Sequence, residues 1–117
     1  MDAPLFAALA KAAENRIKDF QAQDISNTAW AFATVGQKNE PLFAALAKAA
    51  ENRIKDFKAQ AISNTAWAFA TVGQKNEPLF AASSRAAEQR KKDFTAQAIS
   101  NTAWALTDSA ACALGSC

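Results

Sequence analysis

The sequence of 117 residues has no histidine and no tyrosine, and it has only two cysteines, Cys112 and Cys117. Without histidine a zinc site would lack part of its usual ligand set, and a disulfide between these two cysteines would close only a small loop. The sequence also has no glycine-rich phosphate loop and no nucleophile elbow. We therefore expect free thiols, no metal, no cofactor and no enzymatic activity.

Turn-forming residues are scarce as well, with three glycines and three prolines, so we expect helices joined by short connections. Apolar residues make up 50% of the chain, which argues against disorder, but more than half of them are alanines. Alanine favours helices and buries little surface, so the core must come from leucine, isoleucine, phenylalanine and tryptophan.

The net charge and the hydrophobic pattern exclude few further classes of protein. The net charge is +2 with both signs interspersed, a bias too weak to indicate a nucleic-acid-binding protein by itself. No apolar run is long enough for a membrane span. Met1-Asp2-Ala3 leads directly into the repeated sequence, so we expect no targeting peptide within this chain.

The dominant feature is an internal repeat of 37 residues. Residues 4–40 recur at 41–77 with only two exchanges, Gln21 to Lys58 and Asp24 to Ala61. A third copy, residues 78–114, starts in the same way and then diverges. Such a period is typical of helical solenoids. We therefore predict an all-α fold: one domain, residues 1–117, with three helix-turn-helix repeats and a helical C-terminal extension.

Each repeat contains two helical patterns. The first, over residues 5–20 of the first repeat, gathers its apolar side chains on one face and pairs Glu14 with Lys18 four residues later. The second helix is predicted from Ala22 to Val35, and the glycine that follows is expected to end it. The polar residue two places before each proline is expected to cap the first helix, and these residues are Asp2, Asn39 and Asn76.

The third copy has polar residues where the first two have apolar ones. Because two helices cannot bury their apolar face alone, neighbouring repeats must stack. We predict that the exchanged positions face the following repeat, which the third copy lacks, and that the residues after 105 cap this end. The positions are Leu9, Leu46 and Ser83; Ala10, Ala47 and Ser84; and Ile17, Ile54 and Lys91.

The segment Ser26–Gly36, SNTAWAFATVG, resembles the second-helix signature of octotricopeptide and heptatricopeptide repeats, which is similar to ANTLWALAKLG. The stretch 63–73 matches it too, and residues 100–106 match in part. The 37-residue period is similar to that of the heptatricopeptide variant. The resemblance implies an RNA-binding protein of mitochondria or chloroplasts that acts in RNA processing, often with a RAP domain. This chain departs from the pattern because it has few repeats, no RAP-like segment and two almost identical units.

The residues that differ between repeats are the candidates for base-specific recognition. Modular RNA readers hold about one base per repeat through a few variable side chains on a constant scaffold. The exchanges also fit surface drift at a helix start, where Asp24 merely favours the helix dipole. The predicted recognition edge comprises Gln21, Gln23, Asp24, Asn27, Lys58, Gln60, Asn64, Thr95, Gln97 and Asn101.

Other recurring residues have competing interpretations. The asparagines that start at Asn27 fit either a hydrogen bond to a loop carbonyl of a neighbouring repeat, which we favour, or contact with a ligand. The tryptophans can stack on bases, but a place in the core at repeat junctions is commoner. The arginines at position 16 and its equivalents are expected to snorkel or to pair with a neighbouring repeat. The tryptophans are Trp30, Trp67 and Trp104, and the arginines are Arg16, Arg53 and Arg90.

The strongest candidate for phosphate contact is a basic cluster in the third repeat, although a solvated face explains it more simply. It consists of Arg85, Arg90, Lys91 and Lys92. Together with the recognition edge, it favours binding of single-stranded RNA at about one base per repeat. The alternative is a protein-binding solenoid without catalytic or nucleic-acid-binding activity. Protein partners, further repeats and end-to-end self-association are also compatible with the sequence, and no membrane partner is expected.

Overall fold

The computed structural model describes residues 3–74 and 76–113, with side chains placed as far as Thr107. Within these residues the structure is entirely helical, which confirms the predicted fold class. The α-helices are α1 (Ala3–Asn15), α2 (Ala22–Thr34), α3 (Glu40–Asn52), α4 (Ala59–Thr71), α5 (Glu77–Gln89) and α6 (Ala96–Ala113). Each first helix is followed by a short 3-10 helix: η1 (Ile17–Asp19), η2 (Ile54–Asp56) and η3 (Lys91–Asp93).

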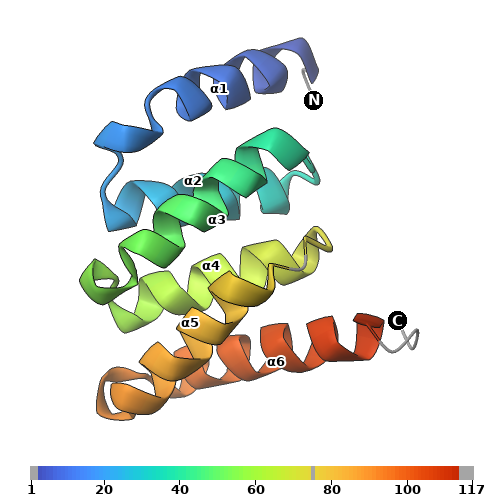
Figure 1. The fold of residues 1–117 in the computed structure, drawn as a ribbon. Coiled ribbons are helices and arrows are strands. Elements are labelled where there is room, and N and C mark those ends of the chain that lie inside the picture. The colour runs from blue at the N-terminus through green and yellow to red at the C-terminus, as the bar shows by residue number, and fades with distance from the viewer. Residues whose placement is uncertain (1–2, 75, 114–117) are drawn as a thin grey trace.

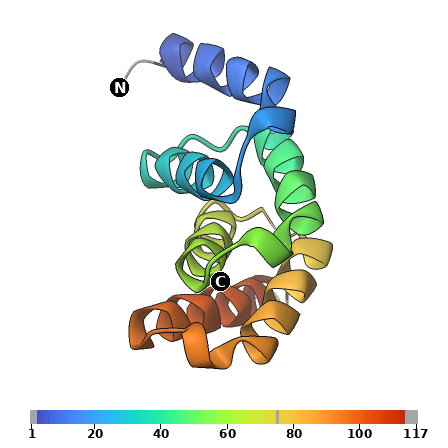
Figure 2. The same cartoon turned by 90° about the vertical axis from the view of Figure 1, so that its left-hand side faces the viewer.

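The helices form two layers, with the repeats stacked from the N-terminal one at the top of Figure 1 to the C-terminal one at the bottom. The second helices of the repeats, α2, α4 and α6, pack most extensively against one another. The first helices, α1, α3 and α5, contact each other less and arc around the second helices (Figure 2). The second helices therefore form the inner, concave layer of a short solenoid that measures 39 × 34 × 22 Å.

The predicted helix ends follow from local residues. The Asn39 side chain accepts a hydrogen bond from the Leu42 backbone at 2.9 Å, and Asn76 accepts one from Leu79 at 2.9 Å. The second helices begin at Ala22 and its equivalents and end before Gly36 and Gly73, both at φ 73°. Glycine adopts this left-handed conformation without steric cost, so both glycines end a helix as predicted. The third predicted cap, Asp2, lies outside the described residues.

The first helix is shorter than predicted. It ends at Asn15, and the chain tightens into η1 before it turns back at Phe20. Glu14 and Lys18 therefore do not lie on one continuous helix, and the predicted pair in α1 is wrong. The turn contains neither glycine nor proline. Its Lys18 carbonyl accepts a hydrogen bond from Arg53 of the next repeat, and the same turn recurs as η3 in the last repeat.

The prediction that all three exchanged positions face the following repeat is partly wrong. Leu9 is 47% exposed, whereas Leu46 and Ser83 are buried, so this position faces the preceding repeat. The next position behaves as predicted, because Ala10 and Ala47 are buried and Ser84 is exposed. Adjacent residues on a helix point about 100° apart, which places them in different interfaces. The third position also fits the prediction, since Ile17 and Ile54 are partly buried and Lys91 is exposed.

The C-terminal extension is helical as far as Ala113, as predicted, while its predicted capping role falls mostly on side chains and residues outside what the structure describes. Helix α6 continues straight to Ala113, beyond the point where α2 and α4 end (Figure 1). Ile99, whose equivalents Ile25 and Ile62 are fully buried, is 53% exposed. Within the described residues, the outer face of the third repeat therefore stays open. Cys117 and the side chain of Cys112 lie outside what the structure describes.

Candidate nucleic-acid interface

One face of each second helix is exposed on the concave side of the solenoid. In α2 it carries Gln23, Asn27, Trp30 and Thr34, spaced by four, three and four residues so that they share one side of the helix. All four are exposed, whereas Ile25, Ala29 and Phe32 on the opposite side of the helix are buried. The same glutamine, asparagine and tryptophan recur in α4 and α6. We call this repeated set the concave ladder.

A hydrogen bond joins the two amides of the ladder in every repeat. The Nε2 group of Gln23 donates to Oδ1 of Asn27 at 2.9 Å, and the equivalent bonds are 2.9 Å for Gln60 and 3.1 Å for Gln97. The asparagine is thus oriented by its own helix, and the predicted bond to a loop carbonyl of a neighbouring repeat is wrong. In each pair the asparagine NH₂ and the glutamine carbonyl oxygen remain available, one donor group beside one acceptor.

We expected the tryptophans in the core, but Trp30 and Trp104 belong to this surface, and only Trp67 packs against the core. Trp30 is 46% exposed and Trp104 is 45% exposed, while Trp67 between them is partly buried. The ring centroids of Trp30 and Trp67 are 6.4 Å apart with an angle of 32° between the rings. The exposed rings of Trp30 and Trp104 are suitable platforms for stacking. The seven-residue spacing from Gln23 to Trp30 could have revealed this shared face in the sequence.

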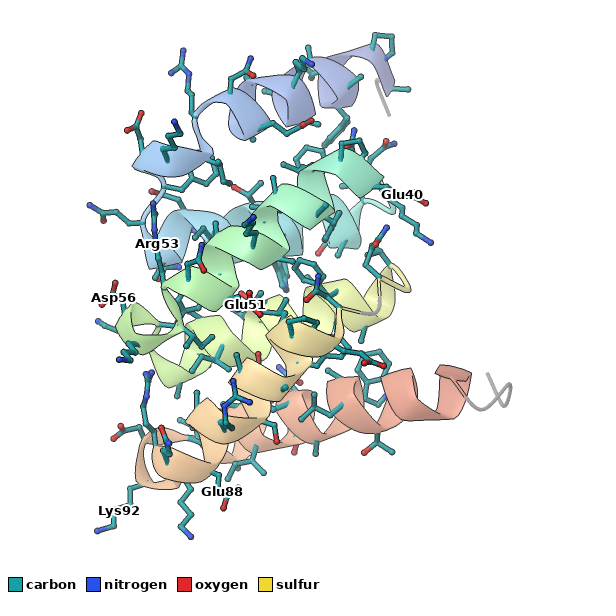
Figure 3. All side chains as sticks on the ribbon, in the orientation of Figure 1. Glu40, Glu51, Arg53, Asp56, Glu88 and Lys92 are labelled. Atoms are coloured by element: carbon teal, nitrogen blue, oxygen red, sulfur yellow. The ribbon has the colours of Figure 1, made fainter. Side chains whose placement is uncertain are left out.

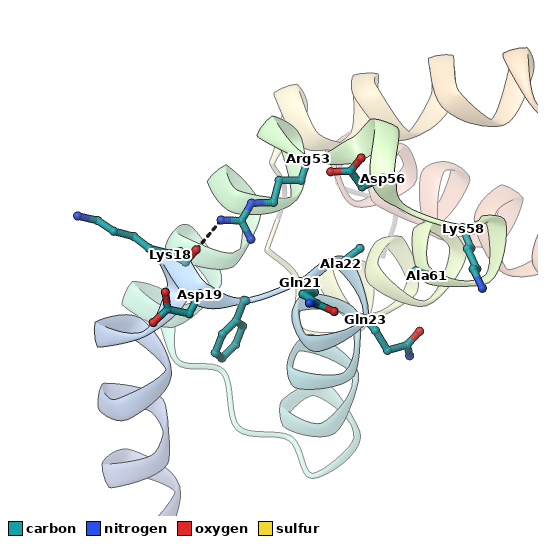
Figure 4. Close-up of a pocket in the computed structure, with 10 residues that line it drawn as sticks. Lys18, Asp19, Gln21, Ala22, Gln23, Arg53, Asp56, Lys58 and Ala61 are labelled. Carbon is teal, nitrogen blue, oxygen red and sulfur yellow. Dashed lines mark hydrogen bonds between the residues drawn. The ribbon is translucent and has the colours of Figure 1, made fainter.

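A pocket opens at each junction between repeats, beside the 3-10 turns. The first, with a volume of about 630 Å³, lies between Gln21 and Gln23 of one repeat and Lys58 of the next (Figure 4). The second, with a volume of about 550 Å³, repeats it one unit further along, with Gln60 and Thr95. Lys18, Arg53 and Asp56 also line the first pocket, although the sequence did not single them out as site residues.

Only one of the two variable positions is accessible in all three repeats. Gln21, Lys58 and Thr95 are exposed at the starts of α2, α4 and α6. At the other position Asp24 is exposed, whereas its equivalents Ala61 and Ala98 are 5% and 1% exposed. This exchange has a packing explanation, because a preceding repeat covers the position in α4 and α6. Asp24 itself completes a capping box, and its carboxylate accepts from the Gln21 backbone at 2.9 Å.

The arginines at the ends of α3 and α5 hold adjacent repeats together, as expected. Arg53 donates from Nη2 to the Lys18 carbonyl at 2.8 Å (Figure 4). Arg90 donates from Nη2 to the Ile54 carbonyl at 2.8 Å and from Nη1 to the Phe57 carbonyl. Arg90 was also a candidate for phosphate binding, but its guanidinium is partly buried and bound to these two carbonyls.

The rest of the basic cluster is divided between two elements. Arg85 is exposed on α5, in the outer layer and away from the concave ladder. Lys91 and Lys92 are exposed in η3, at the edge of the molecule where Arg53 and Asp56 also lie (Figure 3). Acidic residues of η1 and η2 share this edge, so its charge is mixed. The ladder itself carries no charge in the side chains that the structure describes.

The described part of the chain contains no group of three or more cysteine, aspartate or glutamate residues arranged to hold a metal ion. None of its helices is both long and apolar enough to cross a membrane.

Comparison with known protein families shows the family of this chain. Residues 2–110 match the family model of the RNA-editing substrate-binding complex 6 protein, RESC6. The chain belongs to this family. The match covers the first two repeats and most of the third, and the description of RESC6 refers to RNA, as the repeat signature also implied. A comparison with individual curated proteins finds no match.

Proposed function

We propose that this RESC6-family chain binds single-stranded RNA along its concave ladder, without catalysing a reaction. The observation that carries the proposal is the threefold recurrence of a hydrogen-bonded glutamine–asparagine pair beside a tryptophan on one face of each second helix, where Asn64, Trp67 and Asn101 are partly buried and the others are exposed. Unstacked bases bind to proteins through aromatic stacking and through hydrogen bonds to their edges. The ladder presents both types of contact once per repeat.

Each part of the ladder has a distinct role in the proposal. The rings of Trp30 and Trp104 stack on bases, and the free amide groups of each glutamine–asparagine pair meet the base edges. Since these residues are the same in every repeat, they cannot distinguish one base position from another. Gln21, Lys58 and Thr95 at the junction pockets are the variable side chains that can do so.

The small number of repeats limits the RNA affinity of the chain alone. At one base per repeat, the three ladder units hold about three nucleotides. Stacking of roughly 1–3 kcal/mol per base is then opposed by the cost of ordering the strand, so affinity is low. RESC6 is described as a protein of an RNA-editing substrate-binding complex, and we infer that protein partners add contacts to the RNA substrate. Organellar transcripts are the class of RNA that the repeat signature implies.

The test is a titration of fluorescently labelled single-stranded RNA of random sequence, followed by anisotropy at two salt concentrations. We expect wild type to bind at low salt and Trp30→Ala to bind about 5- to 150-fold more weakly, the equivalent of one stacked base. Trp30→Phe, which keeps a ring, is the matched control and should lose less. The proposal is wrong if wild type does not bind at low salt, or if Trp30→Ala binds as wild type does.

A second pair of variants tests the junction pockets. Lys58→Gln and Lys48→Gln remove the same charge from exposed lysines of one repeat, but only Lys58 lines a pocket. We expect Lys58→Gln to reduce the salt dependence of RNA binding and to change base preference at one position, whereas Lys48→Gln leaves both unchanged. Equal effects of the two variants would show that the pockets play no part.

A further inference from the structure

The two end faces of the solenoid remain apolar and open in the described chain. At the N-terminal face a cleft of about 420 Å³ is lined by Leu9, Ala12, Phe20 and Ala31, among others. At the C-terminal face a cleft of about 340 Å³ is lined by Phe94, Ile99, Ala103 and Leu106, among others. Large apolar side chains are exposed on both faces, with Leu9 at 47% and Ile99 at 53%.

These faces are the two halves of an interface that the chain already builds twice. The equivalent of Leu9 in the second repeat is Leu46, which is fully buried against the first repeat. The equivalents of Ile99 are Ile25 and Ile62, which are fully buried against the following repeat. Since the first and second repeats are almost identical, the N-terminal face has nearly the same residues that α3 and α4 present to the preceding repeat.

We propose that a second copy of this chain docks on the first end to end, with its N-terminal face on the C-terminal face of the first. Continuity with the internal repeat interface predicts the contacts. Arg16 of the docking copy is exposed, and it would donate to the Lys91 and Phe94 carbonyls as Arg90 does to those of Ile54 and Phe57. Leu9 would fill the apolar cleft beside Ile99.

The charges at the ends favour this arrangement over contact between like faces. Asp24 occurs only in the first repeat and lies exposed where Ala61 and Ala98 are buried by a preceding repeat. Lys91 occurs only in the third repeat and replaces the isoleucine of the other two. End-to-end docking brings a face with an added negative charge to one with an added positive charge, whereas docking of two identical faces brings like charges together. These polar exchanges also weaken the contact relative to the internal interface, which makes the assembly reversible.

Contact between two different faces leaves an unpaired face on each copy of a dimer, so the assembly grows beyond two copies with concentration, into open chains or a ring. Sedimentation of the whole chain over rising micromolar concentrations should show an average mass that increases beyond two copies. Leu9→Lys blocks the N-terminal face and Ile99→Asp blocks the C-terminal face, because each buries a charge in an apolar cleft and opposes a like charge. Both residues are about half exposed, so these changes leave the core intact, and circular dichroism checks the helix content.

Each blocked variant alone should stay monomeric, while an equimolar mixture should form a 1:1 dimer and nothing larger. The only open N-terminal faces then belong to Ile99→Asp and the only open C-terminal faces to Leu9→Lys. The controls Ala44→Lys and Ala44→Asp add the same charges on the exposed side of α3 and should assemble as wild type does. If Leu9→Lys reduces helix content, Leu9→Gln replaces it, since the position is 47% exposed, glutamine favours helices and docking would bury its amide in an apolar cleft.

Three outcomes would overturn the proposal. They are wild type that stays monomeric at every concentration, a mixture of the blocked variants that stays monomeric, and self-association of either blocked variant alone, which would show docking between like faces. RNA is absent from all samples, so the result is independent of the proposed function.

Discussion

Arg16, Arg53 and Arg90 occupy one position of the repeat but have different partners. Arg90 binds two carbonyls of the preceding repeat and Arg53 binds one. Arg16 is exposed and binds none in the described part of the chain. We therefore expect this arginine to contribute more to stability where it binds more carbonyls of the preceding repeat.

The position allows a graded prediction. Arg90→Met should lower the free energy of unfolding by about 3 kcal/mol, because it leaves two carbonyls without their charged donor. Arg53→Met should cost about half as much, and Arg16→Met less than about 0.5 kcal/mol. Urea unfolding followed by circular dichroism measures all three under conditions where the chain is monomeric. Equal losses for Arg16→Met and Arg90→Met would contradict this account.

The position of Asp24 and Ala98 shows that burial by a preceding repeat changes which side chains are tolerated. Asp24 caps an exposed helix start, so Asp24→Ala should cost about 1 kcal/mol through loss of the capping box. Ala98 is 1% exposed, so Ala98→Asp should cost about 3 kcal/mol because it buries a carboxylate without a partner. Chemical denaturation compares the two. A smaller loss for Ala98→Asp than for Asp24→Ala would show that the preceding repeat does not cover this position.

At the scale of helices, capping decides where α3 and α5 start. Asn39→Ala and Asn76→Ala each remove a side-chain acceptor at a helix N-terminus and should lower stability by about 1 kcal/mol. Asn15→Ala, at the exposed end of α1, is the matched control and should change stability by less than about 0.5 kcal/mol. Thermal unfolding gives the ranking. The capping role is refuted if Asn15→Ala destabilises as much as Asn39→Ala.

The elements also show what a sequence can and cannot predict. The second helix was predicted from Ala22 and its glycine stop because caps, glycines and periodicity act within a few residues. The end of the first helix at Asn15 was missed because the 3-10 turn that follows contains neither glycine nor proline. Arg53, 35 residues away, binds the Lys18 carbonyl of this turn, but the same turn forms as η3 in the third repeat without such a partner.

For the candidate site, the sequence predicted the residues better than their arrangement. Gln23 and Asn27 were assigned to the recognition edge and are exposed in the structure, but their mutual hydrogen bond was not foreseen. The exposure of Trp30 and Trp104 was missed, because the way α2, α4 and α6 pack decides which side of each helix stays open. The wrong assignment of Leu9 has the same origin, since periodicity fixes a face but not the neighbour that covers it.

At the scale of the whole molecule, the concave ladder contains every tryptophan of the chain, and the chain has no tyrosine. Tryptophan emission therefore reports on the proposed RNA-binding surface directly, without a label. Stacking of a base on an exposed indole ring changes this emission, and the change must follow the fraction of protein bound to RNA.

The measurement that tests the central claim most directly is a titration of the wild-type chain with single-stranded RNA at low salt, recorded by tryptophan emission and by sedimentation of the complex. The account predicts saturable quenching whose midpoint agrees with the midpoint of complex formation. It also predicts that Trp30→Phe combined with Trp104→Phe removes most of the quenching, because Trp67 is partly buried between them. Formation of an RNA complex without any change in wild-type tryptophan emission would place the RNA elsewhere and contradict the account.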